Sequence, residues 1–378
     1  MKNSGVFVLV KAWVVLVLGA AGVSGEVCRE DTRGLFCYDR WTVSEPVLQE
    51  GAAGTFDEVA VKDPTIVFYK GRYHLFYTSK ARKGAGEKDW YLSRGGSALG
   101  YVAAERLEDL QKAKRYNLSA IVKEVVVAPQ VFYFEPHKLW YLIAHTTVKG
   151  RPDLMPIYMT NPDIEDIYGW TRPKIIKTRK ANNGFWIDFW VICDDTKAHL
   201  FYTDHEGSIF RFECPIGEFP DGYKNAREET VLTERGENEK GRWRLHEANH
   251  IYYVKSVDKY LQLVEAVYPH PTRKNYWDSR SRFMIAYVAE KLEGPWERAE
   301  SGRNVFAGDP ANLYQEDGTK AKYDQVSHFE LIRSGYNQRL EIEDFKLDLL
   351  FQGFDAAGIG SDYDYDELPW ELMVMRNY

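Results

Sequence analysis

Three stretches of the chain begin at an acidic residue and then follow one plan: an apolar run, a short polar turn and an aromatic-rich run. The acids are Asp63 in KDPTIVFYKGRYHLFYT, Asp188 in IDFWVICDDTKAHLFYT and Glu247 in HEANHIYYVKSVDKYLQLV. Asp and Glu are poor strand residues, and burying them without a partner is costly. The pattern therefore predicts that repeating units direct three acids to one place, which is the candidate active site.

Two further stretches, starting near Ala128 and His328, repeat the plan without the acid. The five starts are roughly 60 to 80 residues apart, a length typical of propeller blades of about four strands. Runs such as TIVFY, QVFYF and DFWVI suit inner strands that are covered on both sides. We therefore predict an all-β fold, a five-bladed β-propeller; a sandwich or two smaller β-domains is the alternative.

The third unit shows the strands most clearly, and the expected ranges are 188–193, 199–203 and 208–214. Hairpin turns are expected at KGR, EPHK, DDTK, KSVDK and SGYNQ. Helical signal is sparse, and residues 104–114 are expected to form one surface helix or turn. The acidic tail SDYDYDELPW should pack back on the fold through Leu368 and Trp370.

The first 25 residues have a basic start, an apolar stretch and small residues at the end, which predicts a signal peptide. An uncleaved anchor is the alternative, and it is disfavoured because Lys11 interrupts the apolar stretch. Cleavage removes Lys2 and Lys11, so the net charge of −7 (49 minus 56) becomes −9 (47 minus 56). We expect residues 26–378 to form one secreted, extracellular catalytic domain that binds neither nucleic acid nor membrane. A neutral partner is the better match, and a monomer is the default expectation.

Four cysteines are present, and Cys28 and Cys37 suit a disulfide in an oxidising compartment. Cys193 and Cys214 fall in apolar strands, where they are either paired or simply buried. No CxxC pair occurs, so no zinc site is expected. Asn117-Leu118-Ser119 is a glycosylation sequon, which predicts a glycoprotein.

Three convergent acids beside aromatic walls point to cleavage of a glycosidic bond. An inverting mechanism needs one carboxyl to protonate the leaving oxygen and another to activate water on the opposite face. Asp63 follows Lys62, which should keep it ionised as the base, and Glu247 is the best-placed proton donor. Asp188 would raise the pKa of the donor by like-charge repulsion. Asp194 and Asp195 fall in a turn and are left out.

The motifs VKDPTIV, VAPQVFYF, WIDFWVICDD, HEANHIYYV and SHFELIR–LLFQG, in this order, resemble glycoside hydrolase family 62. The resemblance runs from about Arg40 to near the C-terminus. It implies a secreted five-bladed propeller that releases α-L-arabinofuranosyl groups from arabinoxylan with inversion. It also implies Asp63 as base, Glu247 as acid and Asp188 as the acid that tunes the donor. The substrate-binding and metal-proximal positions that it implies are Lys62, Trp186, Ile187 and Arg333 for the sugar, and His328 for a channel calcium held largely through water.

The chain departs from the family pattern in three places. Phe351 stands where the family commonly has a tyrosine before Gln-Gly, so a hydroxyl near the pocket is lost. Residues 79–96 are longer and more basic than expected, and residues 255–282 carry the insertion YPHPTRKNYWDSRSR. Two alternative functions are a related family-43 glycosidase, such as a β-xylosidase or arabinanase, and a non-catalytic sugar-binding propeller.

Overall fold

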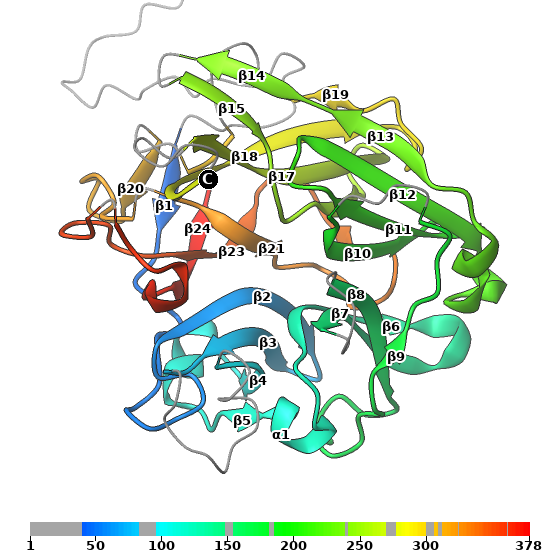
Figure 1. The fold of residues 1–378 in the computed structure, drawn as a ribbon, viewed down its shortest axis with the longest axis horizontal. Coiled ribbons are helices and arrows are strands. Elements are labelled where there is room, and N and C mark those ends of the chain that lie inside the picture. Colours follow the sequence, from blue (N-terminus) through cyan, green and yellow to red (C-terminus); the bar gives the residue numbers. More distant parts are fainter. Residues whose placement is uncertain are drawn as a thin grey trace, which may run out of the picture.

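The computed structural model describes residues 40–82, 96–147, 154–180, 185–238, 241–269, 277–299, 306–308, 312–323, 325–360 and 362–378. Its strands form five sheets arranged around a common centre, which confirms the predicted propeller (Figure 1). The expected signal peptide, and the expected Cys28–Cys37 disulfide, lie outside the described residues. None of the described helices combines the length and apolar character needed to cross a membrane.

Three blades are four-stranded antiparallel sheets in simple sequence order, with the first strand of each innermost. Such hairpin-connected order is expected when each short strand pairs with the one before it. The first blade contains β2 (Ala60–Tyr69), β3 (Arg72–Lys80), β4 (Ser97–Ala104) and β5 (Tyr116–Asn117). The second contains β6 (Val127–Phe134), β7 (Leu139–Thr147), β8 (Leu154–Asn161) and β9 (Lys174–Ile175). The third contains β10 (Ile187–Cys193), β11 (Lys197–Thr203), β12 (Ser208–Pro215) and β13 (Glu229–Thr233), close to the predicted ranges.

The fourth sheet is larger, because the long β17 pairs with β15, β16 and β18. Its strands are β14 (Arg235–Asn238), β15 (Gly241–Leu245), β16 (His250–Val254), β17 (Lys259–Pro269), β18 (Trp277–Ala289), β19 (Glu297–Arg298) and β22 (Glu341–Ile342).

The fifth blade joins the two ends of the described chain. Its strands are β1 (Trp41–Val43), β20 (Leu313–Gln315), β21 (Ser327–Leu331), β23 (Asp348–Gly353) and β24 (Glu371–Arg376). β1 pairs antiparallel with β24, and the two lie side by side in Figure 1. Trp41 in β1 is fully buried and donates its indole N–H to the carbonyl of Phe306 at 2.8 Å. Pairing of the first and last strands within this blade closes the ring.

The helices are short and lie in the connections. They are η2 (Leu107–Lys112), α1 (Leu118–Val122), η3 (Glu135–His137), η4 (Ile216–Glu218), η5 (Asp221–Asn225) and η6 (Tyr365–Glu367). The surface helix or turn expected at 104–114 is the 3₁₀ helix η2. It is shorter than expected, because Ala104 still belongs to β4. Asn117 of the sequon caps α1 by accepting a hydrogen bond from the N–H of Ala120, and glycosylation there stays a prediction.

Local sequence accounts for the first hairpin. Lys70 and Gly71 between β2 and β3 have φ of 48° and 77°. Two consecutive left-handed residues form the type of two-residue turn whose twist matches that of paired strands, and glycine is the residue best suited to it. The predicted KGR turn is therefore confirmed.

The register of the third blade decides the question left open for its two cysteines. Ala198 of β11 pairs with Cys193 of β10 on one side and with Cys214 of β12 on the other. The cysteines are thus two strand spacings apart, about 9.5 Å, which is beyond the reach of a disulfide. Both are buried free thiols.

The expected SGYNQ hairpin turn is wrong. β21 pairs with β23, and residues 333–347 between them run around one end of the channel instead. The carbonyls of Tyr336, Gln338 and Leu340 accept hydrogen bonds from the second, third and fourth blades in turn, at 2.8, 2.9 and 3.2 Å. We call residues 333–347 the channel plug. A sequence pattern cannot distinguish it from a turn, because its partners are backbone groups of other blades.

Candidate active site

A repeated backbone irregularity positions the acids. Asp63, Ala128, Asp188, Ala248 and His328 occupy equivalent places on the inner strands, and all have positive φ, between 26° and 55°. The ladder shifts register at this place in β2, β6, β10 and β21. A β-bulge turns one side chain away from its expected direction. Here the bulges bring Asp63, Asp188 and His328 to the same end of the channel.

The sequence repeat predicted that Glu247 occupies the same place as the other acids. This prediction is wrong by one residue. The equivalent residue of the fourth blade is Ala248, and Glu247 is one position earlier. Ala248 has no functional side chain at this position. Its backbone N–H instead donates a hydrogen bond to Asp188 Oδ2 at 2.7 Å. The fourth blade therefore contributes both a carboxylate and a hydrogen bond that orients the neighbouring one.

Asp63 is held as an ionised carboxylate. Its N–H donates to Gln352 Oε1 at 2.6 Å, and its Oδ1 lies 3.5 Å from His328 Nδ1. Burial acts to raise the pKa of Asp63, but the Lys62 ammonium, His328 and the Thr78 hydroxyl outweigh it and the pKa is lowered. A carboxylate that stays charged is suited to accept a proton from water.

Asp188 has the opposite character. Burial raises its pKa well above the ordinary value, and the nearby charge of Glu247 raises it further. His145 Nε2 lies 3.8 Å from Oδ1, but burial lowers the pKa of His145 to about 4, so it brings no positive charge at neutral pH. Of the three acids, Asp188 is therefore the one with the raised pKa and the greatest affinity for a proton.

Glu247 is surrounded by nitrogen groups. Oε2 accepts from Arg282 at 2.6 Å, while Oε1 lies 2.7 Å from His205 Nε2 and 3.5 Å from His246 Nε2. Burial acts to raise the pKa of Glu247, but Arg282 and the two histidines hold it well below its ordinary value. The expected rise in the pKa of the donor is thus wrong for the resting site, because a buried guanidinium 2.6 Å away, together with the two histidines, outweighs the effect of burial.

Lys62 lies beside the acids, as predicted. Burial acts to lower its pKa, but Tyr365, Asp63 and Glu247 outweigh this and raise it. Its ammonium donates to the Tyr365 hydroxyl at 2.9 Å and lies 4.5 Å from the centre of that ring. Tyr365 reaches the site because the tail packs back through the buried Leu368 and Trp370, as predicted.

The other predicted sugar-binding residues have different settings. Trp186 is almost fully buried, and its indole donates to the Leu154 carbonyl at 2.6 Å. Ile187 is half-buried at the start of β10, next to Asp188. Phe351 is fully buried on β23, where it pairs with Phe329 of β21. Contact of these three with a sugar stays a prediction.

Arg333 does not lie where the prediction placed it. Its guanidinium is fully buried in the channel plug, 3.1 Å from Glu330. It donates to the carbonyls of Ile66 and Val131, at 3.1 and 2.8 Å, further along the inner strands than the acids. These bonds tie two blades together and leave the guanidinium engaged with backbone rather than open to sugar hydroxyls.

His328 faces the reacting carboxylates. Its ring Nδ1 is 3.5 Å from Asp63 and 3.7 Å from Asp188. Its backbone N–H donates to Glu265 Oε2 at 3.0 Å. Calcium takes six to eight oxygen ligands, whereas the described side chains here offer one nitrogen and two carboxylates with roles of their own. Glu265 is paired with Arg282. The described residues do not form a calcium cage, and no step of the reaction is assigned to a metal.

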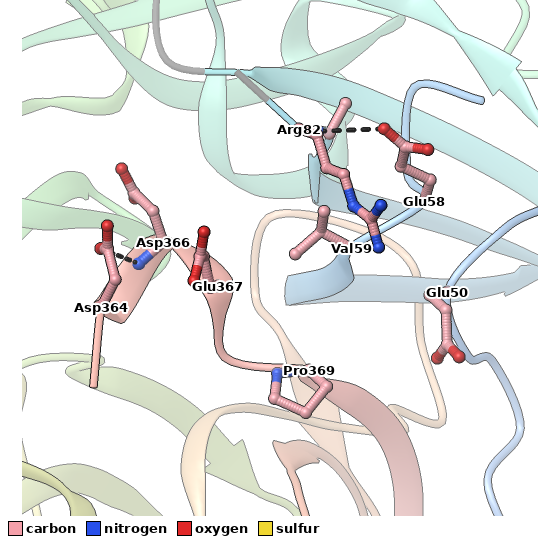
Figure 2. A pocket seen from close by; sticks show the side chains of 9 residues that line it. Glu50, Glu58, Val59, Arg82, Asp364, Asp366, Glu367 and Pro369 are labelled. Atoms are coloured by element: carbon pink, nitrogen blue, oxygen red, sulfur yellow. Dashed lines mark hydrogen bonds between the residues drawn. The ribbon is translucent and has the colours of Figure 1, made fainter. Parts of the chain in front are cut away.

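A cavity of about 680 Å³ has none of the three acids in its lining, but its lining residues Asp364 and Asp366 flank Tyr365, which contacts Lys62. Figure 2 shows η6 and the following segment on one side of it, with the first blade and the segment preceding it on the other. Five of the residues around it are acidic and one is basic, so it disfavours anionic ligands. It is lined by Glu50, Glu58, Val59, Ala81, Arg82, Asp364, Asp366, Glu367 and Pro369.

Sequence reasoning missed several residues that position the acids. Gln352 holds the backbone of Asp63, and its only sequence signal was its place in the LLFQG motif. Arg282 is the last residue of the YPHPTRKNYWDSRSR insertion, which the sequence had marked only as a departure from the family pattern. His205 comes from the turn after β11, where nothing in the local pattern marked it.

A family model, glycosyl hydrolase family 62, matches residues 40–376. The chain belongs to this family. Its predicted resemblance is thereby confirmed, and the family-43 alternative is not supported.

Similar proteins agree with this assignment. "Alpha-L-arabinofuranosidase C" of Cellvibrio japonicus is 31% identical over 340 residues, which cover 89% of this chain but only 47% of that protein. The chain thus spans about half the length of this curated relative. A catalytic domain of a Coprinopsis cinerea GH62 α-L-arabinofuranosidase is 29% identical, with a TM-score of 0.73 over 90% of this chain and 97% of that one. A GH62 hydrolase solved with xylotriose is 28% identical, with a TM-score of 0.70 over 89% and 97%.

Proposed function

We propose that this family-62 chain is a secreted, inverting α-L-arabinofuranosidase that removes arabinofuranosyl side groups from arabinoxylan. The observation that carries the proposal is the convergence of Asp63, Asp188 and Glu247 from three blades on one end of the channel. The relatives named as arabinofuranosidases, and the relative that binds xylotriose, support the sugar and the backbone. The acidic cavity lined by Asp364 and Asp366 suits a neutral polysaccharide better than one rich in uronates.

Each acid has one role in the proposed reaction. Ionised Asp63 takes a proton from the attacking water, and Lys62 and His328 stabilise its charge before the attack. Glu247, whose lowered pKa leaves it ionised in the resting site, first takes up a proton from solvent and then delivers it to the departing oxygen through Oε1, since Oε2 is engaged by Arg282. Asp188, held by the N–H of Ala248, orients the sugar and tunes the proton affinity of Glu247.

The opposite pKa shifts of Asp188 and Glu247 make it necessary to test which of them is the proton donor. A leaving group such as 4-nitrophenolate needs no protonation, whereas a xylose hydroxyl does. Glu247→Gln should lose nearly all activity on arabinoxylan but keep much more on 4-nitrophenyl α-L-arabinofuranoside. Asp63→Asn should lose both activities, because it removes the base.

The released sugar should be followed by proton NMR, with the inverted anomer of arabinose appearing first. If Asp188→Asn, and not Glu247→Gln, keeps its activity on 4-nitrophenyl α-L-arabinofuranoside while losing it on arabinoxylan, Asp188 is the proton donor. Release of xylose or of oligosaccharides would refute the proposed specificity. Binding without release by the unmodified protein would show a non-catalytic propeller.

A further inference from the structure

His205, His246 and Glu247 form a compact group of three metal-ligand side chains at the mouth of the channel. One nitrogen or oxygen atom from each lies within 4.8 Å of the others. The two Nε2 atoms are 2.7 and 3.5 Å from Glu247 Oε1. Three donors from two separate segments thus point to one spot.

The chemistry and spacing of these donors match a particular kind of ion. Two imidazoles and one carboxylate are a ligand set of open zinc sites, in which water completes the tetrahedron. Bonds of about 2.0–2.1 Å at tetrahedral angles place ligand atoms roughly 3.3 Å apart. The observed separations bracket this value, so small side-chain rotations would be enough. The absence of a CxxC pair had led to the expectation of no zinc site, but that motif detects only sites with cysteine ligands.

The surroundings support binding of a cation. Arg282 contacts Oε2 of Glu247 and also pairs with buried Glu265. Lys62 and Asp63 lie beside them, so these five charged groups sum to one negative charge. The His205 and His246 rings stack at 4.2 Å, which aligns their nitrogens. The side chain of His205 is 24% exposed, so an ion can enter from solvent.

A second group of the same residue types shows the contrast. His199, Glu213 and Glu293 also bring ligand atoms within 4.8 Å of one another. Lys197 contacts both carboxylates, at 2.7 and 3.0 Å. A metal ion there would have to displace a cation that is already bound, whereas within the described part of the chain Glu247 Oε1 contacts two imidazoles.

We propose that His205, His246 and Glu247 bind one zinc ion, and that this ion reversibly inhibits the enzyme. The inhibitory part rests on the proposed function, in which Glu247 Oε1 delivers the proton. A metal on that oxygen takes the electron pair that would carry the proton. Calcium and magnesium should not substitute, because they prefer oxygen ligands.

The test uses tag-free protein freed of metal with a chelator. Calorimetry with zinc chloride should show one site, and cobalt should give the strong visible absorption of four-coordinate Co²⁺. His205→Gln and His246→Gln should each weaken binding by about 100-fold or more, since removing a ligand should cost at least as much as removing a second-shell partner. His137→Gln, at an exposed histidine, is the matched control and should bind like the unmodified protein.

Activity supplies a separate readout. Zinc should lower turnover in step with occupancy, a chelator should restore it, and equal calcium should have no effect. Absence of one-to-one zinc binding, or unchanged zinc binding in His205→Gln, would overturn the proposed site. His205 lies in a partly exposed turn, so this variant is informative even if His246→Gln, at a buried residue, fails to fold. Full activity with zinc bound would overturn the inhibition. A metal-free enzyme without arabinofuranosidase activity would refute the proposed function while the binding data still decide the site.

Discussion

Replacing Gln352 by leucine should damage the active site without removing any of its charged groups. Gln352 is 1% exposed, accepts a hydrogen bond from the N–H of Asp63 at 2.6 Å and donates one to Ser327 Oγ at 3.0 Å. Leucine is close in size and makes neither bond. An unsatisfied buried donor costs about 1–3 kcal/mol, and the left-handed backbone of Asp63, at φ 47°, stores strain of similar size that the bond helps to hold.

Release of that backbone should move the base. A misplacement of about 1 Å costs on the order of 10²-fold in rate, so kcat on arabinoxylan should fall by about that factor while KM changes little. Urea unfolding should show a loss of about 1–3 kcal/mol. The assay is steady-state arabinose release together with urea denaturation of the same samples.

Gln325→Leu is the matched control. Gln325 is equally buried and donates one hydrogen bond to the Phe354 carbonyl at 2.7 Å. It should lose stability but keep its turnover. Equal loss of kcat in the two variants, or a destabilised Gln352→Leu with normal turnover, would contradict the positioning argument.

Two further predictions concern stability. Trp41→Ala should cost about 3–5 kcal/mol in urea unfolding, because it empties the buried closure of the ring; a loss below about 1 kcal/mol would mean that β1 contributes little to closure. Asp194→Asn should lose about 1–3 kcal/mol at neutral pH, since Asp194 accepts from the N–H groups of Thr196 and Lys197 and from His199. Burial acts to raise the pKa of Asp194, but these bonds lower it, so its contribution is present above the unfolded pKa and vanishes as pH falls through the folded one. The two proteins should therefore converge in stability at acid pH, and a gap independent of pH would refute this cause.

The repeat plan predicted the blades well because each blade is built from local hairpins. Apolar runs specify the strands, and turn residues such as Lys70-Gly71 specify the connections between them, to within a few residues. The same reasoning failed at residues 334–340, whose hydrogen bonds go to three other blades. Arg333 was misplaced for the same reason, since its partners are carbonyls more than 200 residues away.

The candidate site divides in a similar way. The sequence marked Asp63, Asp188 and Glu247, since an acid at the head of an apolar strand is unusual wherever it occurs. It could not show which carboxyl holds the proton, because that depends on Arg282 lying 2.6 Å from Glu247. Nor could it show that Glu247 stands one position before the bulge that carries the other two acids.

The sequence by itself therefore determined the number of blades, the inner strands and the three acids, because periodicity and composition are local properties of the chain. Only the tertiary structure decided the surroundings of those acids: Gln352 behind Asp63, Arg282 and two histidines around Glu247, and Arg333 in the channel plug. The physical reason is that charge and hydrogen-bond energies depend on distances between groups. Ring closure sets those distances between residues that are far apart along the chain.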